Sequence, residues 1–317
     1  MTQPSTCSES ASTEPLAGSA PLRKVWFIIE QPGPWGSQAI LDSNLPEGFG
    51  EELLETVTDP TIGLAVARRP DLANHERRTT RRRRLWLAHT SPGGVRMRAG
   101  SLDDIRDVLK WDWAAISRGE LPPIGRRSAD PVLFVCTNGK RDLCCALHAR
   151  AIVDELRPDP ELTGQIYEIS HLGGHRFAPT ALLLPTGYLY GRLSVESTRE
   201  VLTSAWNGQV LPELLRGRTS LAPWAQVAEI AVRKQFAVYG IESLDVVVVR
   251  NGKAMSSSTV NELLSDEIVQ VRHRDGRTWK VQLVQEQVGP RQVSCGAESE
   301  IGQVWTATTV EALNNWF

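Results

Sequence analysis

The sequence predicts an α/β fold whose two halves repeat one order of elements, followed by a small C-terminal α+β appendage. Three observations lead to this prediction. The chain has 317 residues, enough for two or three domains. Its hydrophobic content of 41% and charged content of 23% are those of a globular protein. Short apolar runs of strand length alternate along the chain with longer stretches of helical spacing.

The first half begins with an apolar run, VWFIIE, that reads as a buried strand and is followed by the Gly/Pro loop QPGPWG. In order, the pattern predicts a strand at 25–30, a helix between 38 and 57, a strand at 62–67, a hairpin of 85–89 with 95–98, and a helix at 101–109. The hairpin prediction depends on the turn residues SPGG.

The second half repeats this order. It predicts a strand at 132–135, a helix at 142–156, a strand at 165–169, a hairpin of 181–184 with 188–191, and a helix at 194–206. Strand, helix, strand, hairpin and helix is the thioredoxin-like order. Two tandem thioredoxin-like lobes from an internal duplication would explain the repeat, and so would two unrelated α/β segments of similar order.

The C-terminal part predicts an amphipathic helix at 221–238 and a strand at 244–250. A hairpin of 269–272 with 278–284 follows, because HRDG between them places Asp275-Gly276 at a turn. The last 75 or so residues are therefore expected to form the small appendage.

Charge and targeting patterns narrow the function classes. Lys and Arg number 35 against 37 Asp and Glu, for a net charge of -2, so global charge recruits neither nucleic acid nor membrane. The first twenty residues have no apolar signal region, and no apolar run approaches the ~18 residues of a membrane span. Five cysteines, an odd number, do not make a secreted disulfide framework. We expect a cytoplasmic protein in which clustered cysteines have a metal or redox role.

Cysteines and histidines gather in two short blocks. Cys136 ends an apolar strand, and Cys144 and Cys145 fall in the first turn of the next helix, where the helix dipole stabilises thiolates. His171 and His175 lie in SHLGGH. Two Cys and two His could supply four metal ligands.

The two glycines between the histidines argue against a helix, at ~1 kcal/mol each. We expect instead a tight loop in which Gly173 and Gly174 permit positive φ or a close approach of backbone to a cofactor. A metalloprotease motif is excluded because no Glu follows His171.

Spacing alone leaves two cofactors open. Zinc accepts Cys2His2, although structural zinc sites usually begin with more closely spaced cysteines than Cys136 and Cys145. A 2Fe-2S cluster with mixed Cys and His ligation is the other candidate. A third alternative is a thiol-disulfide oxidoreductase using Cys136 with Cys144 or Cys145, although Cys-x-x-Cys is absent.

The residues CTNGKRDLCCA and SHLGGHRFAPTALLLPTGYLYGRL resemble the sucrase/ferredoxin-like family, a branch of thioredoxin-like ferredoxins. The likeness extends to WFIIEQPGPWG and to SCGA around Cys295. The resemblance implies a thioredoxin-like fold holding a 2Fe-2S cluster, with an electron-transfer role. By motif position, the implied ligands are Cys136, Cys145, His171 and His175. Many relatives read Arg-Asp-x-Arg-Cys-Gly where this chain reads RDLCCA, so Cys144 is the alternative to Cys145.

Composition, element order and this resemblance together divide the chain into four parts. We expect a disordered tail (1–20), an N-terminal α/β lobe (21–125), a thioredoxin-like ferredoxin domain (126–240) and the α+β region (241–317). We then expect an electron carrier in preference to an enzyme. The expected partner is another redox protein. Sucrose hydrolysis finds no support, because the sequence isolates no pair of carboxylates for a sugar site.

Three further features have less specific interpretations. Residues 68–84 contain eight arginines, which we interpret as a solvated loop, with a nucleic-acid patch or an acidic docking partner as alternatives. Cys295 is interpreted as a buried apolar side chain in preference to a thiol near the cluster. Cys7, in the tail, is expected to be inert. No Walker loop or Gly-x-Gly-x-x-Gly indicates a nucleotide or flavin site.

Overall fold

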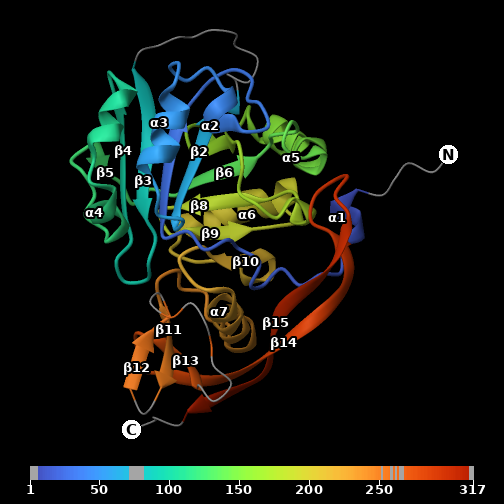
Figure 1. The fold of residues 1–317 in the computed structure, drawn as a ribbon. Helices are drawn as coiled ribbons and strands as arrows, with labels where there is room; N and C mark the ends of the chain where they lie inside the picture. Colours follow the sequence, from blue (N-terminus) through green and yellow to red (C-terminus); the bar gives the residue numbers. More distant parts are fainter. Residues whose placement is uncertain are drawn as a thin grey trace, which may run out of the picture.

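Two β-sheets organise the chain, a large curled sheet and a smaller second sheet (Figure 1). The fold comes from a computed structural model that describes residues 6–70, 82–250, 253–257, 260, 263 and 268–313. The large sheet has ten strands in the order β10-β9-β8-β6-β7-β2-β1-β3-β4-β5. The second sheet has five strands in the order β12-β11-β13-β14-β15. The predicted α/β class is confirmed.

The N-terminal half supplies five strands of the large sheet. They are β1 (Val25–Glu30), β2 (Ile62–Arg68), β3 (Arg83–His89), β4 (Arg96–Leu102) and β5 (Arg126–Arg127). Strand β1 pairs in parallel with β2 and antiparallel with β3, and β3 pairs antiparallel with β4. The helices of this half are α2 (Ala39–Asp42), α3 (Phe49–Thr56), the 3-10 helix η2 (Ile105–Lys110) and α4 (Trp113–Ser117).

The second half repeats this arrangement with β6 (Val132–Cys136), β7 (Ile166–Ile169), β8 (Ala181–Leu184), β9 (Tyr188–Tyr190) and β10 (Leu215–Arg218). Strand β6 pairs in parallel with β7 and antiparallel with β8, and β8 pairs antiparallel with β9. Helix α5 (Leu143–Leu156) connects β6 to β7, and α6 (Val195–Trp206) follows β9. Short 3-10 helices are η3 (Pro160–Leu162), η4 (His175–Phe177) and η5 (Pro212–Leu214). The order repeated in the sequence is therefore also a repeated strand order in space.

Alternation along the strands divides the core into layers. In β1, Phe27 packs outward with residues of α3 and α4, whereas Trp26 and Ile28 face the interior. The interior faces of the two halves pack on one another, with Trp86 of β3 at 5.2 Å from Phe134 of β6 between ring centroids. Because the sheet curls in this way, helices cover its outer faces and the two halves share one inner core.

A buried ion pair lies where the two halves of the sheet join. Strands β2 and β7 pair antiparallel, with Arg68 opposite Glu168. The Arg68 guanidinium approaches the Glu168 carboxylate to 2.6 Å, and the Thr137 hydroxyl donates to the same carboxylate at 2.6 Å. Both charged side chains are 7% exposed, so this pair is compensated inside the protein and not by water.

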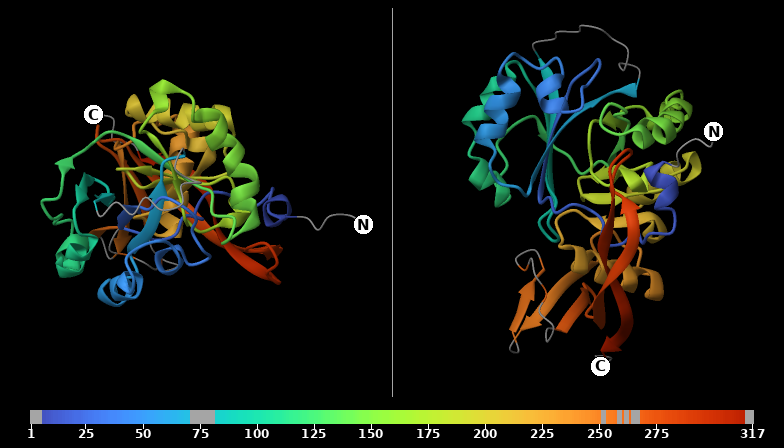
Figure 2. Two further views of the ribbon diagram at one scale, coloured as in Figure 1. Left: turned by 90° about the horizontal axis from the view of Figure 1, so that it is seen from above. Right: turned by 45° about the vertical axis from the view of Figure 1, so that its right-hand side comes forward.

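The second sheet contains β11 (Leu244–Arg250), β12 (Lys253–Ser256), β13 (Ile268–His273), β14 (Thr278–Gln292) and β15 (Ser299–Leu313). Helix α7 (Pro223–Phe236), which lies in the segment predicted to end the ferredoxin domain, packs on this sheet through Trp224 and Val232. The HRDG hairpin is confirmed, with Arg272 opposite Thr278. Strands β14 and β15 form a long hairpin that reaches back beside the large sheet to the N-terminal helix α1 (Figure 2).

The segment predicted as a disordered tail is partly ordered. Helix α1 (Cys7–Ser10) begins at a capping box in which Thr6 and Glu9 exchange backbone and side-chain hydrogen bonds. Cys7 is fully buried, and Glu14 is buried in ion pairs with Arg176 and Arg291. Long-range contacts hold these residues in place, and local sequence patterns do not report such contacts.

Two other predictions differ from the structure. The stretch predicted as a helix at 101–109 is the end of β4 followed by η2, whose N-cap is Asp104. Of the arginine-rich stretch, residues 71–81 lie outside the described residues, but Arg68 and Arg83 are buried and not solvated. Among the described residues, no helix has the length and apolar content needed to span a bilayer.

Candidate metal centre

The candidate centre lies at the edge of the sheet where β6 and β7 end. Cys136 is the last residue of β6, and His171 follows the last residue of β7 by two positions. Because the two strands are parallel neighbours, their carboxyl ends meet at the same edge. This edge brings the cysteine block and the histidine block together.

Helix α5 presents its two adjacent cysteines to different surroundings. Asp142 caps the helix by accepting a hydrogen bond from the Cys144 backbone N–H at 2.9 Å. Cys145 Sγ lies 3.2 Å from Nδ1 of His175, and its thiol donates to Cys136. Cys144 points away from these groups, toward Cys7 and Cys295.

The histidine loop has the glycine conformation that the sequence predicts. Gly173 and Gly174 have φ of 74° and 70°, a left-handed conformation that favours glycine. The loop turns into η4, and the His171 and His175 rings have centroids 5.0 Å apart. A Cβ atom on Gly174 would lie 2.2 Å from Nη2 of Arg216, so a larger residue would displace that side chain.

Burial keeps both histidines neutral near pH 7. It lowers the pKa of His171 to about 4, with a further contribution from the neighbouring His175. Burial also lowers the pKa of His175. Neutral imidazole is the metal-binding form, and Nδ1 of His171 is buried without a hydrogen-bond partner among the described residues.

Cys136 and Cys145 are neighbouring buried thiols, and a hydrogen bond between them shifts their pKa values in opposite directions. The hydrogen bond from Cys145 lowers the pKa of Cys136, and the same bond raises the pKa of Cys145. Metal ligation requires both as thiolates, so a cation at this position would replace the shared proton. Of the four predicted residues, Cys145 and His175 lie with Asp142 in a buried group whose ligand atoms are within 4.8 Å of one another and could hold a metal ion.

Arg216, which the sequence analysis did not single out, supports the histidine loop. It is buried, donates to the carbonyl of Gly173 at 2.8 Å and to Oγ of Ser19 at 3.0 Å, and makes no ion pair with a described carboxylate. Burial lowers the pKa of Arg216 to about 9, which leaves it charged near pH 7. A buried positive charge thus lies beside the candidate ligands.

Residues 16–217 match the family model described as sucrase/ferredoxin-like. This match covers more than half of the chain. The chain belongs to the sucrase/ferredoxin-like family. The resemblance found in the sequence is thereby confirmed, and all four candidate ligands of this sucrase/ferredoxin-like protein lie inside the matched region.

Other comparisons cover less of the chain. Altered inheritance of mitochondria protein 32 from Eremothecium gossypii is 34% identical over 86 residues. That match spans 26% of this chain and 26% of the relative, so it covers about a quarter of each. No solved structure is a significant match to this sucrase/ferredoxin-like chain.

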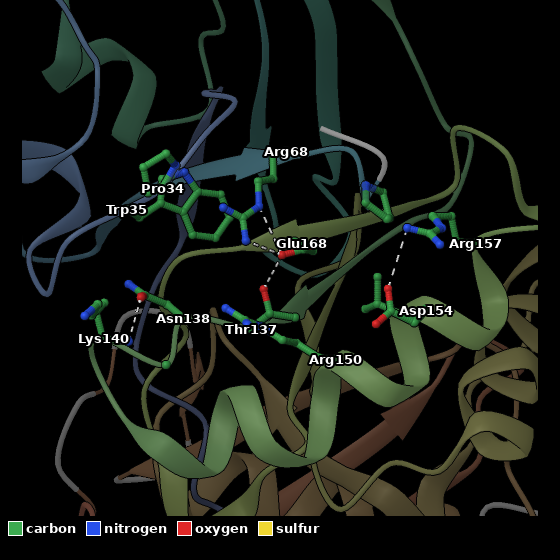
Figure 3. A pocket seen from close by; sticks show the side chains of 13 residues that line it. Pro34, Trp35, Arg68, Thr137, Asn138, Lys140, Arg150, Asp154, Arg157 and Glu168 are labelled. Carbon is green, nitrogen blue, oxygen red and sulfur yellow. Dashed lines mark hydrogen bonds and ion pairs between the residues drawn. The ribbon is translucent and has the colours of Figure 1, made fainter. Parts of the chain in front are cut away.

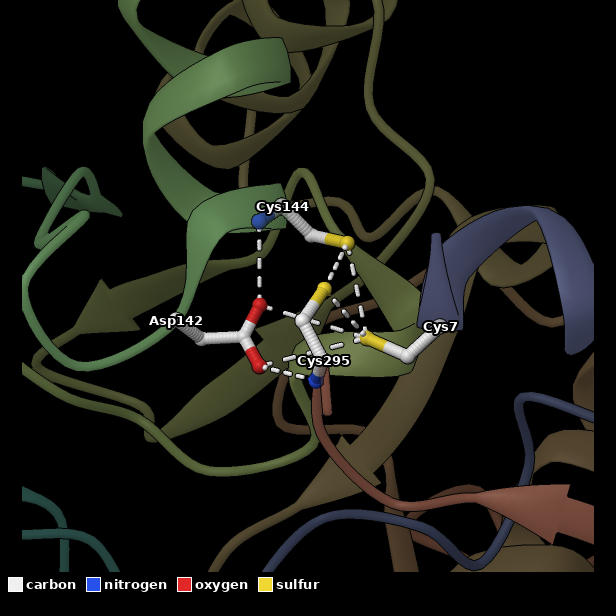
Figure 4. Close-up of side chains that lie close together, drawn as sticks. All are labelled: Cys7, Asp142, Cys144 and Cys295. Carbon is white, nitrogen blue, oxygen red and sulfur yellow. Dashed lines mark hydrogen bonds between the residues drawn. The ribbon is translucent and has the colours of Figure 1, made fainter. Parts of the chain in front are cut away.

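A second group of thiols, which was not predicted from the sequence, lies beside the first. Cys7, Cys144 and Cys295 converge on one another and on Asp142 (Figure 4). Cys7, expected to be inert, and Cys295, expected to be a buried apolar side chain, each lie within 3.5 Å of another sulfur. The only sequence signal was SCGA at Cys295, because Cys7 and Cys295 are far from Cys144 along the chain.

A basic pocket of about 300 Å³ opens beside the loop at residues 137–140 (Figure 3). Four cations and two carboxylates line it, namely Arg68, Lys140, Arg150, Arg157, Asp154 and Glu168. The indole of Trp35 packs under the Arg68 guanidinium at 4.0 Å, which agrees with a packing role for this tryptophan. Among the residues that the structure describes, none of the four candidate ligands lines this pocket.

Proposed function

We propose that this protein is an electron carrier with a 2Fe-2S cluster held by Cys136, Cys145, His171 and His175. The observation that carries the proposal is the convergence of both blocks, with the Cys145 sulfur 3.2 Å from Nδ1 of His175. Membership of the sucrase/ferredoxin-like family supports the choice of an iron-sulfur cluster over zinc.

We further propose that each half of the large sheet is a thioredoxin-like lobe. In support, the orders β2-β1-β3-β4 and β7-β6-β8-β9 have the same pattern of parallel and antiparallel neighbours. The proposed domains at 21–125 and 126–240 correspond to these lobes, and the second one contains the ligands.

The ligand set determines how readily the centre accepts an electron. A bound 2Fe-2S cluster supplies a one-electron couple, and imidazole in place of thiolate raises its potential. Burial lowers the pKa of His171 and of His175 and so favours the neutral imidazoles, while Cys136 and Cys145 would contribute the two thiolates. Arg216 adds a buried positive charge that favours the reduced form.

Solvent access to the histidine ligands would couple electron transfer to proton exchange at their rings. The His171 residue is partly exposed, although its Nδ1 atom is buried. A metal-bound imidazole with solvent access can exchange its second ring proton. We therefore propose a reduction potential that falls as pH rises into the alkaline range.

The electron donor and acceptor would be other proteins in the cytoplasm. In support of a protein partner, the sequence has no nucleotide or flavin motif that would supply reducing equivalents within this chain. A carrier of this kind needs no substrate pocket of its own, since the electron passes through the edge at which the histidines lie.

The test is the metal content of anaerobically purified protein. We expect two irons and two acid-labile sulfides per chain, with a Rieske-like EPR signal after dithionite reduction. His171→Ala should lose this signal, and His273→Ala, in the distant second sheet, should keep it. Zinc at the four residues, or a metal-free protein that forms a reversible disulfide, would contradict the proposal.

A further inference from the structure

Three cysteines from distant parts of the chain form a compact group outside the proposed iron-sulfur site. Cys144 Sγ lies 3.1 Å from Cys295 Sγ and 3.4 Å from Cys7 Sγ, and the distance from Cys295 Sγ to Cys7 Sγ is 3.5 Å. All three are free thiols. They come from α1, from the first turn of α5 and from the connection between β14 and β15 (Figure 4).

Asp142 completes the group on its fourth side. Its two carboxylate oxygens accept backbone N–H bonds from Cys144 and Cys295, each at 2.9 Å, and both lie 3.9 Å from Cys7 Sγ. A carboxylate has about four lone-pair sites, so these two bonds leave capacity for a metal. Asp142 is 4% exposed, so solvent compensates little of its negative charge.

We propose that Cys7, Cys144, Cys295 and Asp142 bind one zinc ion as a structural site. Four ligands without an open position are typical of structural zinc. Tetrahedral zinc with bonds of about 2.3 Å to sulfur requires sulfurs about 3.8 Å apart, close to the spacing of these three thiols. A cluster with several irons would place the sulfurs farther apart, and the carboxylate favours zinc over copper(I).

Hydrogen bonds around the group agree with a ligand role. Ser8 Oγ donates to Cys144 Sγ at 3.3 Å and lies 3.3 Å from Nε2 of His148. Such outer contacts orient the ligands of a metal. Cys7 and Cys295 lie outside residues 16–217, the part of the chain that matches the family model.

The site would join segments that are far apart in sequence. Cys7 and Cys295 are separated from Cys144 by 137 and 151 residues. A metal cross-link over such distances stabilises the folded chain by restricting the unfolded one. It would also hold the tip of the long β14–β15 hairpin and helix α1 against the start of α5, next to Cys145. This inference does not depend on the proposed electron-transfer function.

Zinc and iron measured on the same samples test the inference. We expect one zinc per chain in the wild-type protein, lost in Cys7→Ser and in Cys295→Ser while iron is retained. Cys136→Ser is the matched control, because it should lose iron and keep zinc. Zinc that is lost in Cys136→Ser but retained in Cys7→Ser and Cys295→Ser would overturn the inference. So would a wild-type protein that contains a Cys144–Cys295 disulfide, or copper, in place of zinc.

A measurement on the wild-type protein tests the site even if the variants do not fold. Wild-type protein stripped of zinc by a chelator should bind Co²⁺ with the intense charge-transfer absorption of three thiolates, and Zn²⁺ should displace it. Hydrogen exchange at residues 293–298 should be slower with zinc than without it. Absence of thiolate-to-cobalt bands would overturn the site. If zinc behaves as expected and iron is absent, only the proposed electron-transfer function fails.

Discussion

Cys144 and Cys145 are neighbours in the first turn of α5, yet their sulfurs belong to two separate groups. Cys145 Sγ lies 3.2 Å from Nδ1 of His175, and Cys144 Sγ lies 3.1 Å from the sulfur of Cys295. Successive residues of a helix point about 100° apart. One helical turn can therefore serve two sites, and the positive end of the helix dipole favours negative charge on both sulfurs.

Serine variants of these two cysteines should have opposite effects. Cys145→Ser should lose the iron and the visible absorption, because a serine hydroxyl is a poor replacement for a buried thiolate ligand. Cys144→Ser should keep the iron and lose zinc. Metal analysis with visible spectra of both purified variants checks this prediction, and loss of iron in Cys144→Ser alone would reverse the assignment.

His175→Cys should lower the reduction potential, by roughly 100 mV or more, because a thiolate replaces a neutral imidazole ligand. The wild-type potential should fall by up to about 59 mV per pH unit where one proton accompanies one electron. In the variant this slope should be smaller. Potentiometry from pH 6 to 10 measures both quantities, with His273→Cys as the control that changes neither.

Arg216→Met should also lower the potential, since it removes a buried positive charge near the ligands. A unit charge several ångströms away contributes on the order of 50 to 100 mV at an effective dielectric constant of ~20. Arg216→Lys keeps the charge and should restore most of the potential. An unchanged potential in Arg216→Met, with the iron content intact, would show that the guanidinium acts only on the shape of the loop.

The metal-free protein should lose stability in acid. The folded-state pKa of His171 is lowered to about 4 from its usual 6.5, so the unfolded chain takes up this proton first. The free energy of unfolding should decrease as pH falls from 6.5 toward 4, by at most about 3 kcal/mol. Urea unfolding across this range measures the loss. His171→Gln should have a shallower dependence, and an equal slope in both proteins would argue against the buried neutral ring.

Glu168→Gln should destabilise the join between the two halves of the sheet. It leaves the buried Arg68 guanidinium without its counterion, a change that costs about 3 to 5 kcal/mol. Glu52→Gln breaks an exposed pair with Arg106 and should cost at most about 1 kcal/mol. Urea unfolding compares the two, and similar losses would mean that the buried pair contributes little.

The sequence by itself determined the local features. Apolar runs bounded by turn residues placed strands such as β1 and β6, and two glycines in SHLGGH indicated the positive φ of that loop. These features depend on a few adjacent residues, so local sterics and burial suffice to predict them. The same patterns placed Cys136 at the end of a strand and the pair of cysteines at a helix start.

Only the tertiary structure decided which of these residues meet. Helical spacing indicates that Cys144 and Cys145 diverge, but it does not show what lies on each side. Packing of the long β14–β15 hairpin against α1 brings Cys295 and Cys7 to Cys144, across more than a hundred residues of chain. Such contacts depend on sheet curvature and on the path of distant segments, which no local pattern encodes. For this reason the candidate iron-sulfur ligands were accessible to sequence reasoning and the three-cysteine group was not.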